Sequence, residues 1–183
     1  PVLAVIKAND LAHAVKIVND TGYGLTSGIE SLDEREVNYW KENLKAGNLY
    51  INRGTTGAIV LRQPFGGMGK SAIGAGRKVG IFNYITQFVD FTEKSAPKVE
   101  KKYSNSLTNF ITNCKITHKN EDFNKLEIAL QSYLENYENE FSKAKDYANV
   151  RGEDNHFRYL PLKNVVIRVS SDDTLFEVVS RIL

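Results

Sequence analysis

Residues 1–53 have the sequence PVLAVIKANDLAHAVKIVNDTGYGLTSGIESLDEREVNYWKENLKAGNLYINR, in which strand-like and helix-like patterns alternate. Apolar residues spaced three and four apart predict two helices, which begin after the N-capping residues Asp10 and Asp33. Short apolar or β-branched runs are typical of strands, and they lie at 2–7, 25–31 and 48–53. Strands that alternate with helices favour crossover units and a mainly parallel sheet with flanking helices. The predicted fold class is therefore α/β.

Glycine marks the end of this pattern and the loop that follows it. Gly47 stands after the second predicted helix, where a left-handed residue would end it directly before a strand. From Gly54 to Gly80 the chain then carries eight of its 13 glycines. Such a concentration indicates a long loop with close backbone approaches.

The composition divides the chain into two predicted domains. Residues 1–94 form the first, and it ends in a strand over 86–92 with aromatic residues at alternate positions. A charged, proline-containing linker without periodicity follows at 95–102. The C-terminal extension then has the bounds 103–183, with a long amphipathic helix over 121–148 and a strand and helix unit over 164–183.

Charge and composition argue against several classes of partner. Lys and Arg number 24 against 22 Asp and Glu, so the net charge of +2 indicates neither a nucleic-acid nor a membrane partner. No run approaches the roughly 20 apolar residues of a membrane span. The one cysteine, Cys114, cannot form an internal disulfide, and no apolar leader follows a basic start. Both observations favour a cytoplasmic location.

Several motifs resemble binding sites and fail on spacing. The run GGMGKS at 66–71 lacks the earlier glycine of a phosphate-binding loop, because Pro64 stands at that position. The run at 74–80 has one residue too many between its last glycines for a dinucleotide fingerprint. Cys114 has no motif of an activated thiolate. No metal site is expected, because the three histidines lie far apart at His13, His118 and His156.

The glycine-rich loop at 55–60, followed by QPFGG at 63–67, remains a candidate anion site. Its small residues would let backbone N–H groups face a carboxylate. The alternative is a plain packing loop.

Three segments together resemble the aldehyde dehydrogenase superfamily over residues 1–93. They are PVLAV with the helix that ends in NDTGYGLT, AGNLYIN at 46–52, and PFGG at 64–67. Within that superfamily, NRGTTGAIV at 52–60 with QPFGG looks like the 1-pyrroline-5-carboxylate dehydrogenase branch, which includes the bifunctional proline utilization A enzymes. Residues 150–183 resemble, more loosely, the start of the extra C-terminal region of the longer bifunctional members.

The resemblance implies an NAD-dependent enzyme of proline catabolism that oxidises glutamate semialdehyde to glutamate. The nucleophilic cysteine, the general base and the dinucleotide fold would then lie upstream of Pro1. The chain alone is therefore expected neither to be catalytic nor to bind a cofactor, and FAD would belong to a fused proline dehydrogenase.

The resemblance also implies roles for particular residues of this chain. Gly57 and Ala58 would anchor the substrate carboxylate through backbone amides, and Phe65 would line the aldehyde pocket. The strand at 86–92 would join a neighbouring subunit, which predicts a homo-oligomer. The alternative is a noncatalytic assembly or binding module, with the helix at 121–148 as its partner surface.

Overall fold

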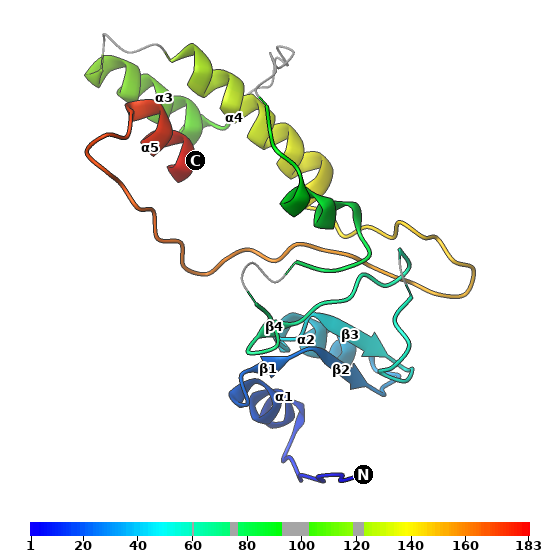
Figure 1. The fold of residues 1–183 in the computed structure, drawn as a ribbon. Coiled ribbons are helices and arrows are strands. Elements are labelled where there is room, and N and C mark those ends of the chain that lie inside the picture. Colours follow the sequence, from blue (N-terminus) through cyan, green and yellow to red (C-terminus); the bar gives the residue numbers. More distant parts are fainter. Residues whose placement is uncertain (60, 74–76, 93–102, 119–122) are drawn as a thin grey trace. The chain divides into compact units, whose positions relative to one another are not determined.

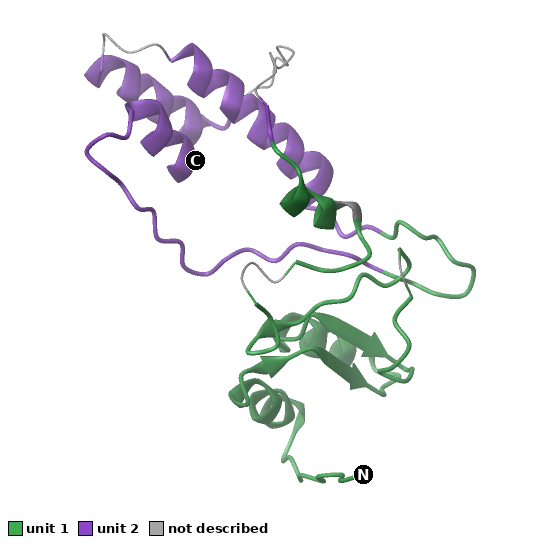
Figure 2. Ribbon diagram, in the orientation of Figure 1, with its two compact units in different colours: residues 1–90, 146–155 green, residues 91–145, 156–183 purple. Residues whose placement is uncertain are grey.

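The computed structural model describes residues 1–59, 61–73, 77–92, 103–118 and 123–183, which form two compact units (Figures 1 and 2). Unit 1 comprises Pro1–Asp90 together with Asp146–Asn155, and unit 2 comprises Phe91–Lys145 with His156–Leu183. The predicted extension is therefore not one continuous unit, because a short loop within it belongs to unit 1. The predicted linker at 95–102 lies outside the described residues.

Unit 1 is built on a parallel strand pair. Strands β2 (Thr26–Ile29) and β3 (Asn48–Ile51) pair in parallel, with Thr26 opposite Asn48. Helix α2 (Glu34–Asn43) connects them and completes the crossover that the sequence predicts. Helix α1 (Leu11–Asp20) precedes a short antiparallel pair of β1 (Tyr23–Gly24) with β4 (Met68–Gly69).

Local sequence signals account for both helices of unit 1. The Asp10 side chain accepts the His13 N–H at 2.7 Å, and the Asp33 side chain accepts the Arg35 N–H at 2.9 Å. Each aspartate thus satisfies an N–H group that the first helical turn leaves free. Between the helices and β3 lies a core of buried side chains from Val15, Trp40, Leu44 and Ala46. The capped starts and the burial of Trp40 and Leu44 confirm the predicted helices.

Gly47 corrects one prediction. It does not have a positive φ, and α2 already ends at Asn43, after which Leu44 is extended with φ −79° and ψ 134°. Glycine is needed at position 47 because a Cβ there would lie 1.8 Å from the carbonyl oxygen of Gly66. The position is restricted by contact with another segment, which helix-ending rules do not describe.

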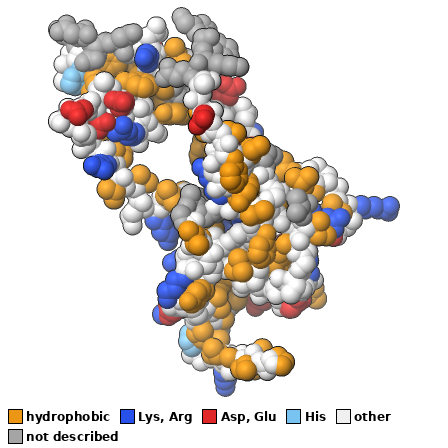
Figure 3. Space-filling model, in the orientation of Figure 1, with side chains coloured by type: hydrophobic (Ala, Val, Ile, Leu, Met, Phe, Trp, Pro, Cys, Tyr) orange, Lys and Arg blue, Asp and Glu red, His pale blue; other side chains and the backbone are white. Residues whose placement is uncertain are grey.

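Two predicted strands are not formed in unit 1. The run at 2–7 has no regular structure and extends from α1 with exposed apolar side chains (Figures 1 and 3). Where the sequence predicts a strand over 86–92, residues Phe82–Phe88 form the 3-10 helix η1, followed by Val89 with φ −128° and ψ 150°. A strand needs backbone hydrogen bonds to a neighbour, and the described part of the chain supplies none to 2–7 or 89–92.

The described residues of unit 2 form three α-helices and one π turn. These are α3 (Asn105–Thr117), α4 (Asn124–Asn136), the π turn η2 (Tyr137–Phe141) and α5 (Leu175–Ile182). Their buried apolar side chains are Ile111, Leu126, Leu130 and Val179. None of the described helices is long and apolar enough to cross a membrane.

The sequence predicts the elements of unit 2 less well. Of the helix predicted over 121–148, residues 121 and 122 lie outside the described part; α4 begins at Asn124, and η2 ends at Phe141. Beyond it, Lys145 pairs with Phe157 in an isolated antiparallel bridge. No strand forms over 165–169, whereas the predicted last helix is confirmed as α5.

Candidate functional site

The candidate site is the loop that follows β3. Asn52 begins it with a φ of 54°, a left-handed conformation that asparagine tolerates better than most residues. Its side chain donates to the Ser31 carbonyl oxygen and accepts the Ser31 N–H, both at 2.9 Å. Asn52 thereby joins the end of β3 to the segment after β2 and fixes where the loop starts.

Arg53 supports the first turn of this loop. Its guanidinium donates to the carbonyl oxygens of Gly54 and Thr56 at 3.3 Å each. It also lies over the Tyr50 ring, 4.9 Å from the ring centroid, which is a favourable cation–π distance. The loop therefore has a fixed positive charge at its base.

Gly57 and Ala58, the two predicted anchoring residues, lie at the exposed part of the loop. Gly57 has a φ of 83°, and no atom lies within 4 Å of the position that a Cβ would take. Among the described residues, no hydrogen bond uses the N–H group of either residue. A left-handed residue with free neighbouring N–H groups forms the kind of concavity that binds anions.

Phe65, the third predicted residue, lies further along the same loop. The Gln63 N–H donates to the Ile59 carbonyl oxygen at 2.7 Å, which turns the chain between Ala58 and Phe65. Phe65 is half-buried and exchanges two backbone hydrogen bonds with Val79, at 2.9 and 2.8 Å. The structure describes no direct contact of Phe65 with Gly57 or Ala58.

A polar cluster next to Phe65 was not foreseen from the sequence. The Asn48 side chain donates to the Pro64 carbonyl oxygen at 2.9 Å and accepts the Gly66 N–H at 3.1 Å. The Lys78 ammonium donates to the Gly66 carbonyl oxygen at 3.0 Å and to Asn48 Oδ1 at 3.3 Å. Burial lowers the pKa of Lys78 to about 8. The available signal was a lysine within a glycine-rich run, which by itself has no specific meaning.

The returning loop Asp146–Asn155 contacts the same region within unit 1. Glu153 forms an ion pair with Arg62 at 3.4 Å, and Asn155 Oδ1 accepts from Gln63 Nε2 at 3.3 Å. Gln63 Oε1 is buried and has no hydrogen-bond partner among the described residues. Arg62 and Gln63, just before Pro64, are therefore also positioned by contacts with residues that lie far away in the sequence.

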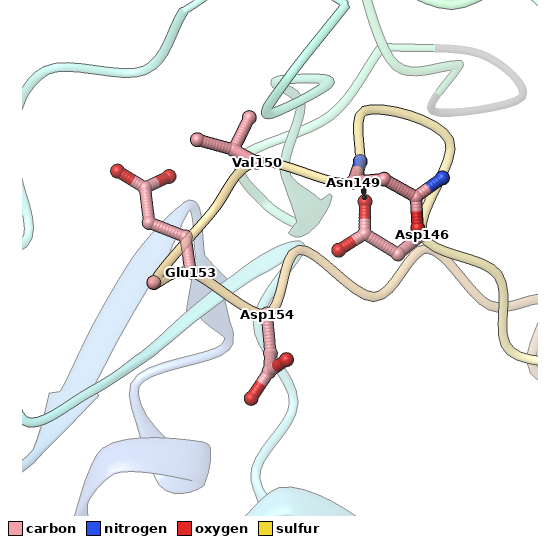
Figure 4. Close-up of a pocket in the computed structure, with 6 residues that line it drawn as sticks. Asp146, Asn149, Val150, Glu153 and Asp154 are labelled. Atoms are coloured by element: carbon pink, nitrogen blue, oxygen red, sulfur yellow. Dashed lines mark hydrogen bonds between the residues drawn. The ribbon is translucent and has the colours of Figure 1, made fainter.

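The returning loop itself lines a shallow pocket with three carboxylates (Figure 4). Asp146 accepts the N–H groups of Ala148, Asn149 and Asn155, so its oxygens shape the loop. Figure 4 shows the side chains of Glu153 and Asp154 pointing away from each other. No group of three His, Cys, Asp or Glu side chains in the described residues could hold a metal ion.

The other motifs have structural roles where the structure describes them. In the run 66–71, the Lys70 N–H donates to the Gly22 carbonyl oxygen at 2.9 Å, and its ammonium donates to the Thr21 carbonyl oxygen at 3.0 Å. These bonds join β4 to the end of α1 and use the lysine that a phosphate loop would need. Of the run 74–80, residues 74–76 lie outside the described part. Cys114 lies half-buried on α3, in unit 2.

Comparison with known proteins places this loop in a family. The sequence profile of the aldehyde dehydrogenase family matches residues 1–92, half of the 183-residue chain. The chain belongs to the aldehyde dehydrogenase family. The resemblance drawn from the sequence motifs is thereby confirmed, and the matched residues include the whole candidate site.

Relatives within the aldehyde dehydrogenase family are more specific. The 1-pyrroline-5-carboxylate dehydrogenases of Bacillus cytotoxicus and Geobacillus sp. are each 46% identical over 85 residues, which are 46% of this chain and 16% of theirs. The structure of Proline Utilization A (PutA) from Corynebacterium freiburgense is 41% identical with a TM-score of 0.68, covering 85% of this chain and 15% of that one. The chain thus spans about a sixth of these relatives, and the PutA similarity extends beyond residue 92.

Proposed function

We propose that this chain is the C-terminal, carboxylate-anchoring part of an NAD-dependent 1-pyrroline-5-carboxylate dehydrogenase, which oxidises glutamate semialdehyde to glutamate in proline catabolism. The observation that carries the proposal is the exposed loop in which no described residue accepts a hydrogen bond from the N–H groups of Gly57 and Ala58. The names of the three relatives described above, two 1-pyrroline-5-carboxylate dehydrogenases and PutA, support this substrate. The PutA similarity further supports a parent protein fused to an FAD-dependent proline dehydrogenase.

The role of the loop follows from the shape of the substrate. Glutamate semialdehyde carries a carboxylate at one end and the aldehyde at the other. The Gly57 and Ala58 N–H groups would bind the carboxylate, and the positive charge of Arg53 would favour an anion at this loop. Binding at the remote end positions the aldehyde carbon, while Phe65 would shield it from water.

The remaining chemistry would come from other parts of the complete protein. In this reaction a cysteine thiolate attacks the aldehyde, hydride leaves to NAD, and water hydrolyses the thioester. The connection from β2 to α2 in this chain does not suit a dinucleotide, because it contains the carboxylate of Asp33 where a pyrophosphate would need N–H groups and glycine. No step is therefore assigned to a cofactor bound by this chain.

The proposal extends to assembly and location. Phe88, the last residue of η1, and Phe91 just after it are exposed by 70% and 79%, and exposed aromatic side chains suit a contact with a second subunit. A homo-oligomer is therefore part of the proposal. A cytoplasmic location is also part of it, consistent with the free thiol of Cys114.

The first test is substitution of the anchor in the complete protein. Ala58→Asp should raise the KM for pyrroline-5-carboxylate by about tenfold or more, because the new carboxylate would repel and crowd that of the substrate. The measurement is NADH formation at varied substrate concentration.

Ala12→Asp is the matched control, because Ala12 is exposed at the start of α1, where an acidic residue is well tolerated. It should leave the KM unchanged. Equal KM values for Ala58→Asp and the wild type would remove the anchor assignment. A folded complete protein that forms no NADH would instead favour the noncatalytic assembly module.

A further inference from the structure

The Asn48 side chain bridges the residues on both sides of Phe65. Its Nδ2 donates to the Pro64 carbonyl oxygen at 2.9 Å, and its Oδ1 accepts the Gly66 N–H at 3.1 Å. One side-chain amide thus makes the donor and acceptor contacts that a neighbouring strand would make. The backbone before and after Phe65 is fixed by a residue at the start of β3.

Lys78 extends this network from the other side. Its ammonium donates to the Gly66 carbonyl oxygen at 3.0 Å, to Asn48 Oδ1 at 3.3 Å and to the Gly47 carbonyl oxygen. All three donors of the ammonium are therefore used. Val79, the next residue, is the backbone partner of Phe65.

The segments in this network are packed too closely to shift independently. A Cβ on Gly47 would lie 1.8 Å from the Gly66 carbonyl oxygen, and a Cβ on Gly66 would lie 3.2 Å from Lys78 Cα. A polar network that is partly removed from water and has its hydrogen bonds satisfied holds its segments in place. Any loss of a donor from Lys78 or Asn48 is therefore transmitted to the backbone around Phe65.

We propose that Lys78, together with Asn48, is a positioning residue that fixes Phe65 in the aldehyde pocket of the enzyme. The inference rests on the proposed function, in which Phe65 contacts the substrate. It assigns a purpose to a half-buried lysine that has no carboxylate partner among the described residues.

The network is expected to respond to pH. The described partners of the ammonium, Gly47, Asn48 and Gly66, carry no ionisable side chain. Burial lowers the pKa of Lys78 to about 8. Above that pH the neutral amine has two N–H donors for three acceptors, so the hydrogen bond from Lys78 to the Gly66 carbonyl oxygen weakens.

The first experiment replaces Lys78 in the complete enzyme. Lys78→Met keeps the length of the side chain and removes its donors. The KM for pyrroline-5-carboxylate should rise about tenfold, since a small misplacement of a pocket residue is costly. Lys70→Met is the matched control: Lys70 is exposed in the same loop and bonds to Thr21, and its loss should leave the KM within about twofold.

The second experiment measures the KM as a function of pH, because a loss of stability alone would not shift the pH at which the KM rises. The KM of the wild type and of Lys70→Met, which keeps Lys78, should both rise above about pH 8, whereas the KM of Lys78→Met should not. Asn48→Asp loses the bond to Pro64 and should start with a higher KM at pH 7. Its new carboxylate beside Lys78 raises the pKa of the ammonium, so its alkaline rise in KM should begin at least about one unit higher.

The third experiment tests whether Lys78 acts through Phe65. If it does, the KM of the double variant Lys78→Met with Phe65→Ala should be within about twofold of the KM of Phe65→Ala alone. If the two residues acted independently, the double variant would show the product of the two single increases in KM. Should Lys78→Met fail to fold, the pH profile of Asn48→Asp still decides, because an unshifted alkaline rise would contradict the proposal.

The outcomes separate this inference from the proposed function. An active wild type with an impaired Phe65→Ala, but a normal KM and pH profile in Lys78→Met and Asn48→Asp, would overturn the positioning role alone. A complete protein without activity on pyrroline-5-carboxylate would overturn both.

Discussion

At the scale of single residues, Gly47 is the position that tolerates least change. Gly47→Ala would place a methyl group 1.8 Å from the Gly66 carbonyl oxygen, so either β3 or the loop at 64–67 must move. Such overpacking should cost about 3 kcal/mol. Amide hydrogen exchange over β3 in the complete protein should then become about a hundredfold faster.

Gly54→Ala is the corresponding control, because nothing lies within 4 Å of its Cβ position and its φ is not left-handed. Exchange over β3 should stay within about threefold of the wild type. If the two variants behave alike, the close approach of Gly47 and Gly66 is not a real restriction.

Residues of the candidate site differ in how far a sequence can reveal them. Gly57, Ala58 and Phe65 could be named because they stand in motifs that resemble a family. Asn48 and Lys78 could not, because their partners are backbone carbonyl and N–H groups, which any residue possesses. The left-handed conformation of Gly57 likewise does not follow from the sequence, because glycine adopts both signs of φ.

At the scale of elements, local signals predict helices well and isolated strands poorly. The caps of α1 and α2 and the spacing of their apolar residues lie within a few positions, so both helices are confirmed. The strands predicted at 2–7, 86–92 and 165–169 are not formed, since strand formation depends on a neighbouring strand that periodicity cannot supply. Helix α3 was missed because it is rich in Asn and Thr, which have low helix propensity.

Helix α5 allows a test of a local signal in unit 2. Its first turn has a capping box, in which the Thr174 hydroxyl accepts the Glu177 N–H and the Glu177 carboxylate accepts the Thr174 N–H. Thr174→Ala should cost about 1 kcal/mol, which corresponds to roughly fivefold faster exchange of the α5 amides. Ser171→Ala, outside the helix, should have no effect there. Equal exchange in both variants would show that packing against α4 alone holds α5.

At the scale of the whole molecule, assembly can be tested through the exposed aromatic residues. Phe88→Lys combined with Phe91→Lys should convert an oligomeric complete enzyme into a monomer, because charges would replace the apolar contacts of the added strand. Light scattering coupled to gel filtration measures the mass. Leu32→Lys, at a residue exposed by 98%, is the control and should leave the mass unchanged. A double variant that keeps the wild-type mass would place the interface elsewhere.

Because Asp146–Asn155 belong to unit 1, the part of the chain that matches the family and the compact unit that contains it do not end at the same residue. The family match ends at residue 92, yet unit 1 is completed by a loop more than fifty residues later, through Glu153 and Asn155. A protein truncated after residue 92 would therefore lack Glu153 and Asn155, the partners of Arg62 and Gln63. Those two residues lie only a few positions before Phe65. Conversely, a break in the backbone between Asp90 and Phe91 would divide unit 1 itself, because the second fragment would still carry residues 146–155 of that unit.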